Sequence, residues 1–372
     1  MARPLISLVM IVKNEARGIR ETLESAKPYV DRYCLVDTGS TDGTPEIMRE
    51  AMAGVPGNLH LEPFVDFGTT RSRALDLAGV EPVFTLMLSG DETLHNGDAL
   101  RTFCDQHRDG EEGAYFLPIH FGPQIYDSAR LARADNRWRY VGSTHEVLRG
   151  PNGSAVQVRV PGPFIKHDLT HRDAKGQRGA WERDLDLLGN ALRTDPSDTR
   201  ATFYLAQTFE CLGRYEQALS MYRKRVELGG WKEEVYEAKF RIARVRHLLG
   251  HSWAEVQQSY LDAYAFSPTR AEPLHAIAQH WCEEKNWPLT YMFAWTGAQI
   301  AYPKDSHLFV DAGVYETKLA DLLATSAYYV GEYEMGRAAA ANLLARYPDN
   351  ERYLRNFEFY RAKFYDEPKL TA

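Results

Sequence analysis

The chain has 372 residues, of which 44% are hydrophobic and 26% charged, and its formal net charge is −7. This length is comfortable for two domains with real cores, and the acidic balance argues against passive binding of long duplex DNA. The four cysteines are widely spaced and form no C-x-x-C pair, so neither a zinc site nor a disulfide framework is indicated. We expect a reduced, cytoplasmic setting, no signal peptide and no transmembrane segment, because no apolar run approaches about 20 residues.

Strands and helices are expected to alternate from residue 1 to about residue 170. Apolar runs predict strands at residues 5–12, 33–36, 59–63, 83–88, 115–121 and 156–160. Helical spacing and capping residues predict helices at residues 15–26 and 69–77, and a third that begins at Thr44. Such alternation implies βαβ units and a mostly parallel sheet, which is the α/β class.

Helical patterns replace the strand signals from about residue 178 to the end of the chain. Prolines recur at intervals near one or two periods of about 34 residues, at Pro196, Pro268 and Pro303. A Gly-x-Tyr turn occurs at Gly213 and again at Gly331. This pattern resembles tetratricopeptide repeats and predicts a stack of helix pairs, each burying its apolar face on a neighbour. We therefore expect an α/β domain over residues 1–177 and an all-α repeat domain over residues 178–372.

The acidic stretch Ser89-Gly90-Asp91-Glu92 directly follows the predicted strand at residues 83–88. Ligands of open α/β sheets bind at the carboxyl ends of parallel strands, where this stretch is expected to lie. Hard carboxylate oxygens suit Mg²⁺ or Mn²⁺, and such a cation suits a diphosphate. Exposed turn acids without a ligand are the alternative.

A second carboxylate, Asp37, ends the strand at residues 33–36 and opens the run DTGSTDGT at residues 37–44. A carboxylate in that place can accept hydrogen bonds from a uracil or a ribose, and Gly39 lets the backbone approach a ligand closely. The alternative is that the Asp and Thr side chains only cap the next helix.

These motifs resemble those of family 2 glycosyltransferases, which have a GT-A fold. Residues 11–15, IVKNE, match the K-N-E motif of the family, and residues 37–44 match its D-x-G-S-x-D-x-T motif. Residues 89–92 match its D-x-D-E motif, except that Ser89 replaces the first Asp. The helical tail fits the branch of the family that carries tetratricopeptide-like repeats, which includes bacterial peptide glycosyltransferases. The resemblance thus covers nearly the whole chain.

The resemblance implies a nucleotide pocket lined by Asn14 and Glu15, with Asp37 and Gly39 against the nucleoside. Residues 66–73 match the F-x-x-x-R-N segment of the family, with Ser72 where Asn is usual. By this match Arg71 lies near the nucleotide and the metal-binding acids. A helix cap at Asn14 and a solvated helix face carrying Arg71 are the alternatives.

The resemblance also implies a divalent cation held by Asp91 and by a late histidine, His167. Nitrogen and carboxylate ligands together would favour Mn²⁺ over Mg²⁺. Ser89 can reach a ribose or a water through its hydroxyl, but it brings no charge, so metal binding should be weaker than with Asp. A structural role for His167 is the alternative.

Residues 138–146, WRYVGSTHE, resemble the W-x-Y-x-G-x-x-H-E segment of this branch. Inversion at the anomeric carbon needs a base that takes the proton of the acceptor, and Glu146 is the candidate. His145 would orient Glu146 or contact the diphosphate; alternatively the two residues are a structural pair. His171 and Arg172 would screen the departing diphosphate or form a polar linker.

The sequence therefore predicts an inverting, metal-dependent glycosyltransferase. It would move a sugar from a nucleotide-diphosphate donor, a UDP-sugar, to a hydroxyl or thiol of a peptide, protein or glycan acceptor. The helical domain would select the acceptor or build a homo-oligomer. One alternative is a non-catalytic tetratricopeptide scaffold with a degenerate transferase domain, for which Ser89 and Ser72 argue. The other is a glycosyltransferase acting on modified nucleic acid, a partner that the net charge disfavours.

Overall fold

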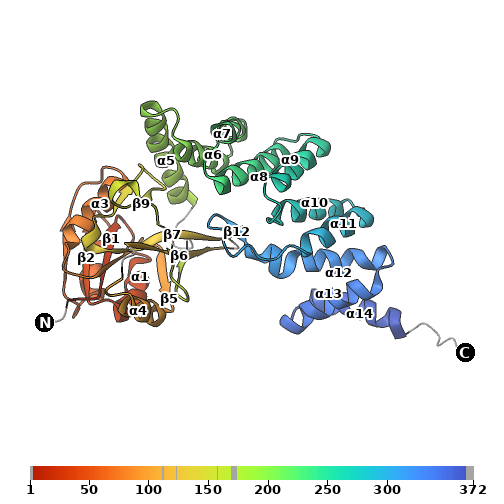
Figure 1. Ribbon diagram of the computed structural model, residues 1–372, viewed down its shortest axis with the longest axis horizontal. Coiled ribbons are helices and arrows are strands. Elements are labelled where there is room, and N and C mark those ends of the chain that lie inside the picture. Colours follow the sequence, from red (N-terminus) through yellow and green to blue (C-terminus); the bar gives the residue numbers. More distant parts are fainter. Residues whose placement is uncertain (1–2, 111–112, 123, 157, 169–173, 366–372) are drawn as a thin grey trace, which may run out of the picture. The chain divides into compact units, whose positions relative to one another are not determined.

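The computed structural model describes residues 3–110, 113–122, 124–156, 158–168 and 174–365. The chain divides into two compact units, Met1–Met221 and Tyr222–Ala372 (Figure 1). His171 and Arg172 lie outside the described residues.

The first unit contains a sheet with helices on both faces. Its strands are β1 Ile6–Val12, β2 Arg32–Asp37, β3 Gly57–Leu61, β4 Phe84–Leu88, β5 Glu92–His95, β6 Ala114–Phe121, β7 Gln124–Arg133, β8 Arg139–Val141, β9 Val147–Arg149, β10 Val158–Arg159 and β11 Phe164–His167. Its helices are α1 Ile19–Ala26, α2 Thr44–Ala51, α3 Phe67–Ala78, α4 Gly97–Gln106, α5 Ala174–Thr194 and α6 Thr199–Cys211. Helix α7, Tyr215–Leu228, crosses the division between the two units.

The main sheet has the strand order β3-β2-β1-β4-β7-β6-β11-β5. Strands β3, β2, β1 and β4 are parallel, as the sequence predicts. Strand β7 is antiparallel to both β4 and β6, β11 is parallel to β6, and β5 is antiparallel to β11. Strands β8 and β9 form a separate antiparallel ribbon. The parallel half therefore matches the expected α/β sheet, and the antiparallel pairs extend it.

Two apolar layers cover the two faces of the sheet. Leu8 and Met10 of β1 belong to the layer that contains Leu23 of α1, whereas Val9 belongs to the layer that contains Ala74 of α3. Successive residues of a strand point to opposite faces, so a continuous apolar run such as β1 packs against both layers. Figure 1 shows α1 and α4 on one side of β1 and β2, and α3 on the other.

Helix α1 begins at Ile19 and not at residue 15, where the sequence pattern places its start. The backbone N–H groups of Asn14, Glu15 and Ala16 donate instead to Ser40 Oγ at 2.9 Å, Thr44 Oγ1 at 2.9 Å and Asp42 Oδ2 at 3.1 Å. These hydrogen bonds tie residues 14–16 to side chains at the loop that follows β2. The three residues therefore connect β1 to that loop, and the helix begins only at Ile19.

The second unit is built mainly of helices, each of which packs on the next in chain order. Its elements are α8 Lys232–Leu248, α9 Trp253–Phe266, α10 Glu272–Glu283, α11 Trp287–Ala298, the short strand β12 Val310–Asp311, a π-helical turn Val314–Lys318, α12 Leu319–Tyr329, α13 Tyr333–Arg346 and α14 Glu351–Tyr365. Pro273 and Pro288 lie in the first turns of α10 and α11, where the missing N–H costs no hydrogen bond. The predicted stack of helices is confirmed, and the short strand β12 is an addition that the sequence did not predict.

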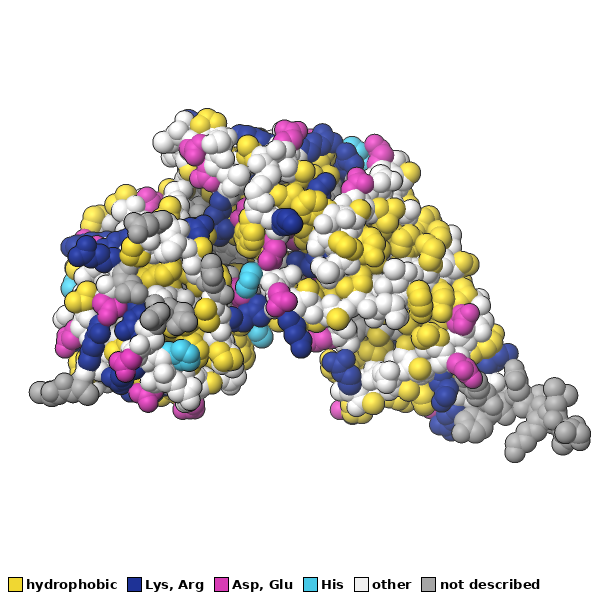
Figure 2. Space-filling view, viewed as in Figure 1, with side chains coloured by type: hydrophobic (Ala, Val, Ile, Leu, Met, Phe, Trp, Pro, Cys, Tyr) yellow, Lys and Arg dark blue, Asp and Glu magenta, His cyan; other side chains and the backbone are white. Residues whose placement is uncertain are grey.

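Large apolar side chains remain on the surface of the second unit, among them Met292, Trp295, Tyr329 and Phe359. Figure 2 shows hydrophobic side chains over much of this unit. In the part of the chain that the structure describes, no helix has both the length and the apolar character needed to cross a membrane.

Candidate functional site

The carboxyl ends of the parallel strands bring the predicted site residues to one edge of the sheet. Val12 at the end of β1 pairs with Asp37 at the end of β2, and Met10 pairs with Leu88 at the end of β4. Asn14, Asp37 and Ser89 follow or occupy these strand ends. Loops at this edge of a parallel sheet form the usual ligand crevice of open α/β folds.

Asp37 is 2% exposed, and only one of its carboxylate oxygens is satisfied within the protein. Oδ2 accepts hydrogen bonds from the backbone N–H groups of Gly39 at 3.1 Å and Ser40 at 3.0 Å. Oδ1 is buried and has no hydrogen-bond partner. An unsatisfied buried acceptor costs about 1–3 kcal/mol, so a ligand N–H or O–H that reaches Oδ1 would recover this energy. Gly39 has φ +98°, a conformation that favours glycine.

Asn14 and Glu15 connect the Asp37 loop to the acidic stretch. The side chain of Asn14 accepts a hydrogen bond from the Thr41 N–H at 2.8 Å. Glu15 packs against Gly90 so closely that a Cβ at Gly90 would lie 2.7 Å from Glu15 Cγ. Glu15 thus lies between residues 37–44, which are predicted to bind the nucleoside, and residues 89–92.

Arg71 of α3 contacts both Ser89 and Glu146. Its Nη1 donates to Glu146 Oε1 at 2.5 Å, and its Nη2 donates to Ser89 Oγ at 2.9 Å. The side chains of Arg71 and Glu146 are 12% and 7% exposed. Burial alone would raise the pKa of Glu146, but the Arg71 guanidinium holds this pKa below its usual value. Glu146 is therefore a carboxylate, and Arg71 Nε remains buried without a partner.

Asp91 and His167 lie together because β11 runs antiparallel to β5. This pairing places His167 opposite Glu92, and His167 Nε2 lies 3.3 Å from Asp91 Oδ2. Burial would lower the pKa of His167, but its hydrogen bond and charge interaction with Asp91 raise that pKa. The described residues contain no group of three or more His, Cys, Asp or Glu side chains that could hold a metal ion. Asp91 and His167 offer two ligands, which fits a cation that takes its remaining ligands from phosphate oxygens and water.

Glu92 and Arg130 form a buried ion pair that the sequence analysis did not assign to the site. Arg130 Nη2 donates to Glu92 Oε1 at 2.5 Å, and the two side chains are 8% and 3% exposed. Glu92 Oε2 accepts from the Ser89 N–H at 2.8 Å. The pair therefore fixes the turn that carries Ser89 and Asp91. The D-x-D-E match contained Glu92, but nothing local in the sequence points to Arg130 as its partner.

Helix α3 holds one side of the segment that leads to Glu146. Ser72 Oγ accepts from the Tyr140 N–H at 2.9 Å and donates to the Tyr140 carbonyl at 3.2 Å. The Phe67 N–H donates to the Ser143 carbonyl at 2.9 Å. A Cβ at Gly68 would lie 2.3 Å from the Gly142 carbonyl oxygen, so only glycine fits there. Ser72, which departs from the family pattern, thus has a clear structural role.

Helices α5 and α6 hold the other side of this segment. Thr144 Oγ1 donates to Asp184 Oδ1 of α5 at 3.2 Å, and Arg200 Nε of α6 donates to the His145 carbonyl at 2.7 Å. The imidazole of His145 stacks on the ring of Tyr204 with centroids 3.9 Å apart. Removal from water and the charge of Arg200 lower the pKa of His145 to about 4, so the ring is neutral at pH 7.

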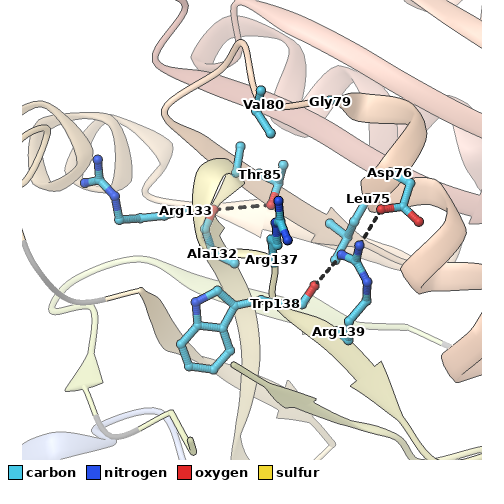
Figure 3. A pocket seen from close by; sticks show the side chains of 11 residues that line it. Leu75, Asp76, Gly79, Val80, Thr85, Ala132, Arg133, Arg137, Trp138 and Arg139 are labelled. Carbon is cyan, nitrogen blue, oxygen red and sulfur yellow. Dashed lines mark hydrogen bonds and ion pairs between the residues drawn. The ribbon is translucent and has the colours of Figure 1, made fainter. Parts of the chain in front are cut away.

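A pocket lies at the other end of β4. It is lined by Leu75, Asp76, Gly79, Val80, Thr85, Ala132, Arg133, Ala134, Arg137, Trp138 and Arg139 (Figure 3). Thr85 is near the amino end of β4, whereas Ser89 follows its carboxyl end. Arg139 Nη2 pairs with Asp76 Oδ1 at 2.5 Å beside this pocket. None of the candidate site residues Asp37, Arg71, Asp91, Glu146 and His167 lines this pocket, although Trp138 and Arg139 belong to the segment at residues 138–146.

Comparison with known proteins finds a family match in the N-terminal part of the chain. Residues 7–104 match the family Glycosyl transferase family 2. The chain is 31% identical over 206 residues to a TPR repeat-containing protein of Synechococcus elongatus. That alignment covers 52% of this chain and 49% of the relative. It is 20% identical over 227 residues to the SPbeta prophage-derived glycosyltransferase SunS of Bacillus subtilis, covering 60% of this chain and 53% of SunS.

Among solved structures, the C-terminal part of a TPR repeat-containing protein from Cytophaga hutchinsonii aligns at a TM-score of 0.41 and 12% identity. That alignment covers 52% of this chain and 70% of the other. The chain spans about half the length of the curated relatives it matches.

Proposed function

Because this chain joins a family 2 glycosyltransferase domain to a tetratricopeptide-like region of paired helices, we propose that it is an inverting glycosyltransferase. It would transfer a sugar from a UDP-linked donor to a hydroxyl or thiol of a peptide, protein or glycan. The observation that carries the proposal is the buried, unpaired Oδ1 of Asp37, at the same edge of the sheet as Asp91 and His167.

Asp37 would bind the nucleoside, because its free Oδ1 can accept a hydrogen bond from a base N–H or a ribose hydroxyl. Asp91 and His167 would hold Mn²⁺ or Mg²⁺, and the cation would neutralise charge on the leaving diphosphate when bound. Arg71, with a buried guanidinium and an unpaired Nε, would add a second positive charge on the same side.

Glu146 would be the base. It is ionised, which is the form that can accept a proton, and Arg71 keeps it so. The acceptor oxygen or sulfur would bond to the anomeric carbon while its proton passes to Glu146. The bond between that carbon and the diphosphate oxygen would break, and the nucleoside diphosphate would leave with the electron pair. Neutral His145 would orient the segment that carries Glu146.

We assign the catalytic domain to residues 1–177 and the acceptor-selecting or oligomer-forming domain to residues 178–372. The compact units divide later, after Met221, because α5 and α6 group with the sheet. The exposed apolar side chains of the second unit are consistent with binding a protein or peptide there. The cytoplasm is the proposed location, because the four cysteines are widely spaced and form no C-x-x-C pair.

The test measures UDP release from UDP-glucose and UDP-N-acetylglucosamine, with and without Mn²⁺, in the wild-type chain and in Asp91→Asn. Asp98→Asn is the matched control, because Asp98 is an exposed acid in the first turn of α4. We expect Mn²⁺-dependent release that Asp91→Asn abolishes and Asp98→Asn retains. In parallel, millimolar UDP should raise the unfolding temperature of the wild type, since a ligand stabilises the state that binds it. No release together with no stabilisation by UDP would favour a non-catalytic scaffold.

A further inference from the structure

We propose that α5 and α6 are part of the catalytic apparatus, with Arg200 and Tyr204 acting as positioning residues for Glu146. This inference rests on the proposed function, because Glu146 has a catalytic task only in that reaction. It moves the functional boundary of the transferase beyond residue 177 and into the helices that the sequence assigns to the repeat domain.

The segment that ends at Glu146 has an unusual backbone. Gly142 has φ +113° and His145 has φ +50°. A left-handed conformation at a residue with a side chain costs about 1–2 kcal/mol, so surrounding contacts must hold His145 in place. Because His145 directly precedes Glu146, its conformation sets the direction in which the Glu146 side chain leaves the backbone.

Helix α6 supplies two contacts that fix His145. Arg200 Nε donates to the His145 carbonyl at 2.7 Å, which pins the peptide that joins His145 to Glu146. The ring of Tyr204 lies parallel to the imidazole, with an interplanar angle of 5°. Arg200 and Tyr204 are four residues apart and so lie on one face of α6, and the guanidinium sits 4.8 Å from the Tyr204 ring centroid.

Helix α5 fixes the two residues before His145. Thr144 Oγ1 donates to Asp184 Oδ1 at 3.2 Å, and Ser143 Oγ donates to the Leu187 carbonyl at 3.4 Å. Residues 143, 144 and 145 therefore each contact α5 or α6 through a side chain or a carbonyl. Helix α3 contacts the same segment through Ser72 and Arg71.

The contacts from α3 and those from α6 respond differently when a proton passes to Glu146. Arg71 holds Glu146 by its carboxylate charge, and that attraction weakens when Glu146 takes a proton. Arg200 and Tyr204 hold the backbone and the neighbouring ring, which do not change charge in this step. These two residues can therefore keep Glu146 in place throughout the reaction.

The kinetic test compares Arg200→Ala and Tyr204→Leu with Tyr204→Phe, which keeps the stacked ring, and with Arg193→Ala, an exposed arginine on α5. UDP release is measured with Mn²⁺ and whichever of UDP-glucose and UDP-N-acetylglucosamine the wild type hydrolyses. We expect kcat to fall about 10-fold or more in Arg200→Ala and Tyr204→Leu, with the donor KM within about 2-fold, because a misplaced base costs up to ~10²-fold. Arg193→Ala should keep the wild-type kcat. Tyr204→Phe keeps the stacked ring but loses the hydroxyl that accepts from Arg200 Nη2 at 3.3 Å, so its kcat should fall less than that of Tyr204→Leu.

A second measurement does not depend on turnover. Hydrogen–deuterium exchange of peptides covering residues 140–148 is followed in the full chain without ligands. We expect faster exchange in Arg200→Ala and Tyr204→Leu and unchanged exchange in Arg193→Ala, because released segments open more often.

Unchanged exchange in Arg200→Ala and Tyr204→Leu would overturn the positioning role, and so would faster exchange with an unaltered kcat. An equal loss of kcat in Tyr204→Phe would also overturn it, since the stacked ring is retained there. If the wild type releases no UDP and UDP does not raise its unfolding temperature, the proposed function fails and the catalytic role fails with it. Exchange would then still show whether α6 holds this segment.

Discussion

Arg71 and Glu146 form a nearly buried ion pair, with 2.5 Å between Nη1 and Oε1, that joins α3 to the segment ending at Glu146. The same guanidinium reaches Ser89 through Nη2. One side chain thus connects the candidate base to the turn that holds Asp91. A buried ion pair is costly to break from one side, because the remaining charge is left without a partner.

Replacing Arg71 by alanine should therefore destabilise the fold strongly. We expect Arg71→Ala to lower the free energy of unfolding by about 3 kcal/mol, since it leaves the Glu146 carboxylate buried and unpaired. Arg73→Ala is the control, because Arg73 pairs with Glu62 at the surface and is 52% exposed. That pair should contribute below about 1 kcal/mol. Urea unfolding of the two variants checks this, and equal losses would contradict the assigned burial.

The lowered pKa of Glu146 predicts a pH dependence of stability. A carboxyl group with a lower pKa in the folded state stabilises the fold above its unfolded value of 4.5, and this contribution is lost as pH falls through the folded-state pKa. Glu146→Gln should remove that part of the acid dependence. Urea unfolding of wild type and Glu146→Gln at several pH values below 6 measures the difference. The stability difference between wild type and Glu146→Gln should shrink as pH falls. A difference that grows toward acid pH would contradict the lowered pKa of Glu146.

Ser89→Asp should tighten Mn²⁺ binding severalfold, because affinity for hard cations follows ligand charge. The added carboxylate would lie where family 2 glycosyltransferases carry the first Asp of their D-x-D-E motif. Ser89→Asn is the control of similar size without charge. Isothermal titration with Mn²⁺ in the presence of UDP distinguishes them. Equal affinities in wild type, Ser89→Asp and Ser89→Asn would argue against the alignment of residues 89–92 with the metal site.

Gly68→Ala should disturb the segment that carries Glu146. A Cβ at residue 68 would lie 2.3 Å from the Gly142 carbonyl oxygen, so either α3 or residues 140–146 must shift. We expect a loss of about 1–3 kcal/mol in the free energy of unfolding and reduced turnover. Gly179→Ala in α5 is the control, since its Cβ meets nothing within 4 Å and alanine favours a helix by up to about 1 kcal/mol. Thermal unfolding of both variants checks the opposite signs.

The sequence predicted the parallel half of the sheet well because strands buried on both faces appear as continuous apolar runs. Residues 5–12 and 83–88 are such runs, and the structure has β1 and β4 there. The position of Asp37 at the end of β2 follows from the same reasoning. The roles assigned to Asp37, Asp91, Glu146 and His167 remain predictions, which the variants above address.

The contacts between distant segments could not be predicted. Helix α1 starts at Ile19 and not at the predicted residue 15. The side chains of Ser40, Asp42 and Thr44 accept hydrogen bonds from the N–H groups of residues 14–16, which a helix cap would otherwise satisfy. The contacts of Arg200 and Tyr204 with His145 join residues about 55 positions apart, and local periodicity carries no information about them. Arg130 is hidden for the same reason, because its partner Glu92 is 38 positions away.

The pairing of β11 with β5 places Asp91 and His167 together, so this part of the site does not tolerate a change in the length of either strand. His167 lies beside Asp91 only because His167 is opposite Glu92 in an antiparallel register. A single residue inserted into β11 would turn His167 to the other face of the sheet, and one inserted into β5 would do the same to Glu92, because side chains alternate. Homologues that share this part of the site should therefore vary in the amino acids of residues 92–95 and 164–167 while keeping both lengths constant.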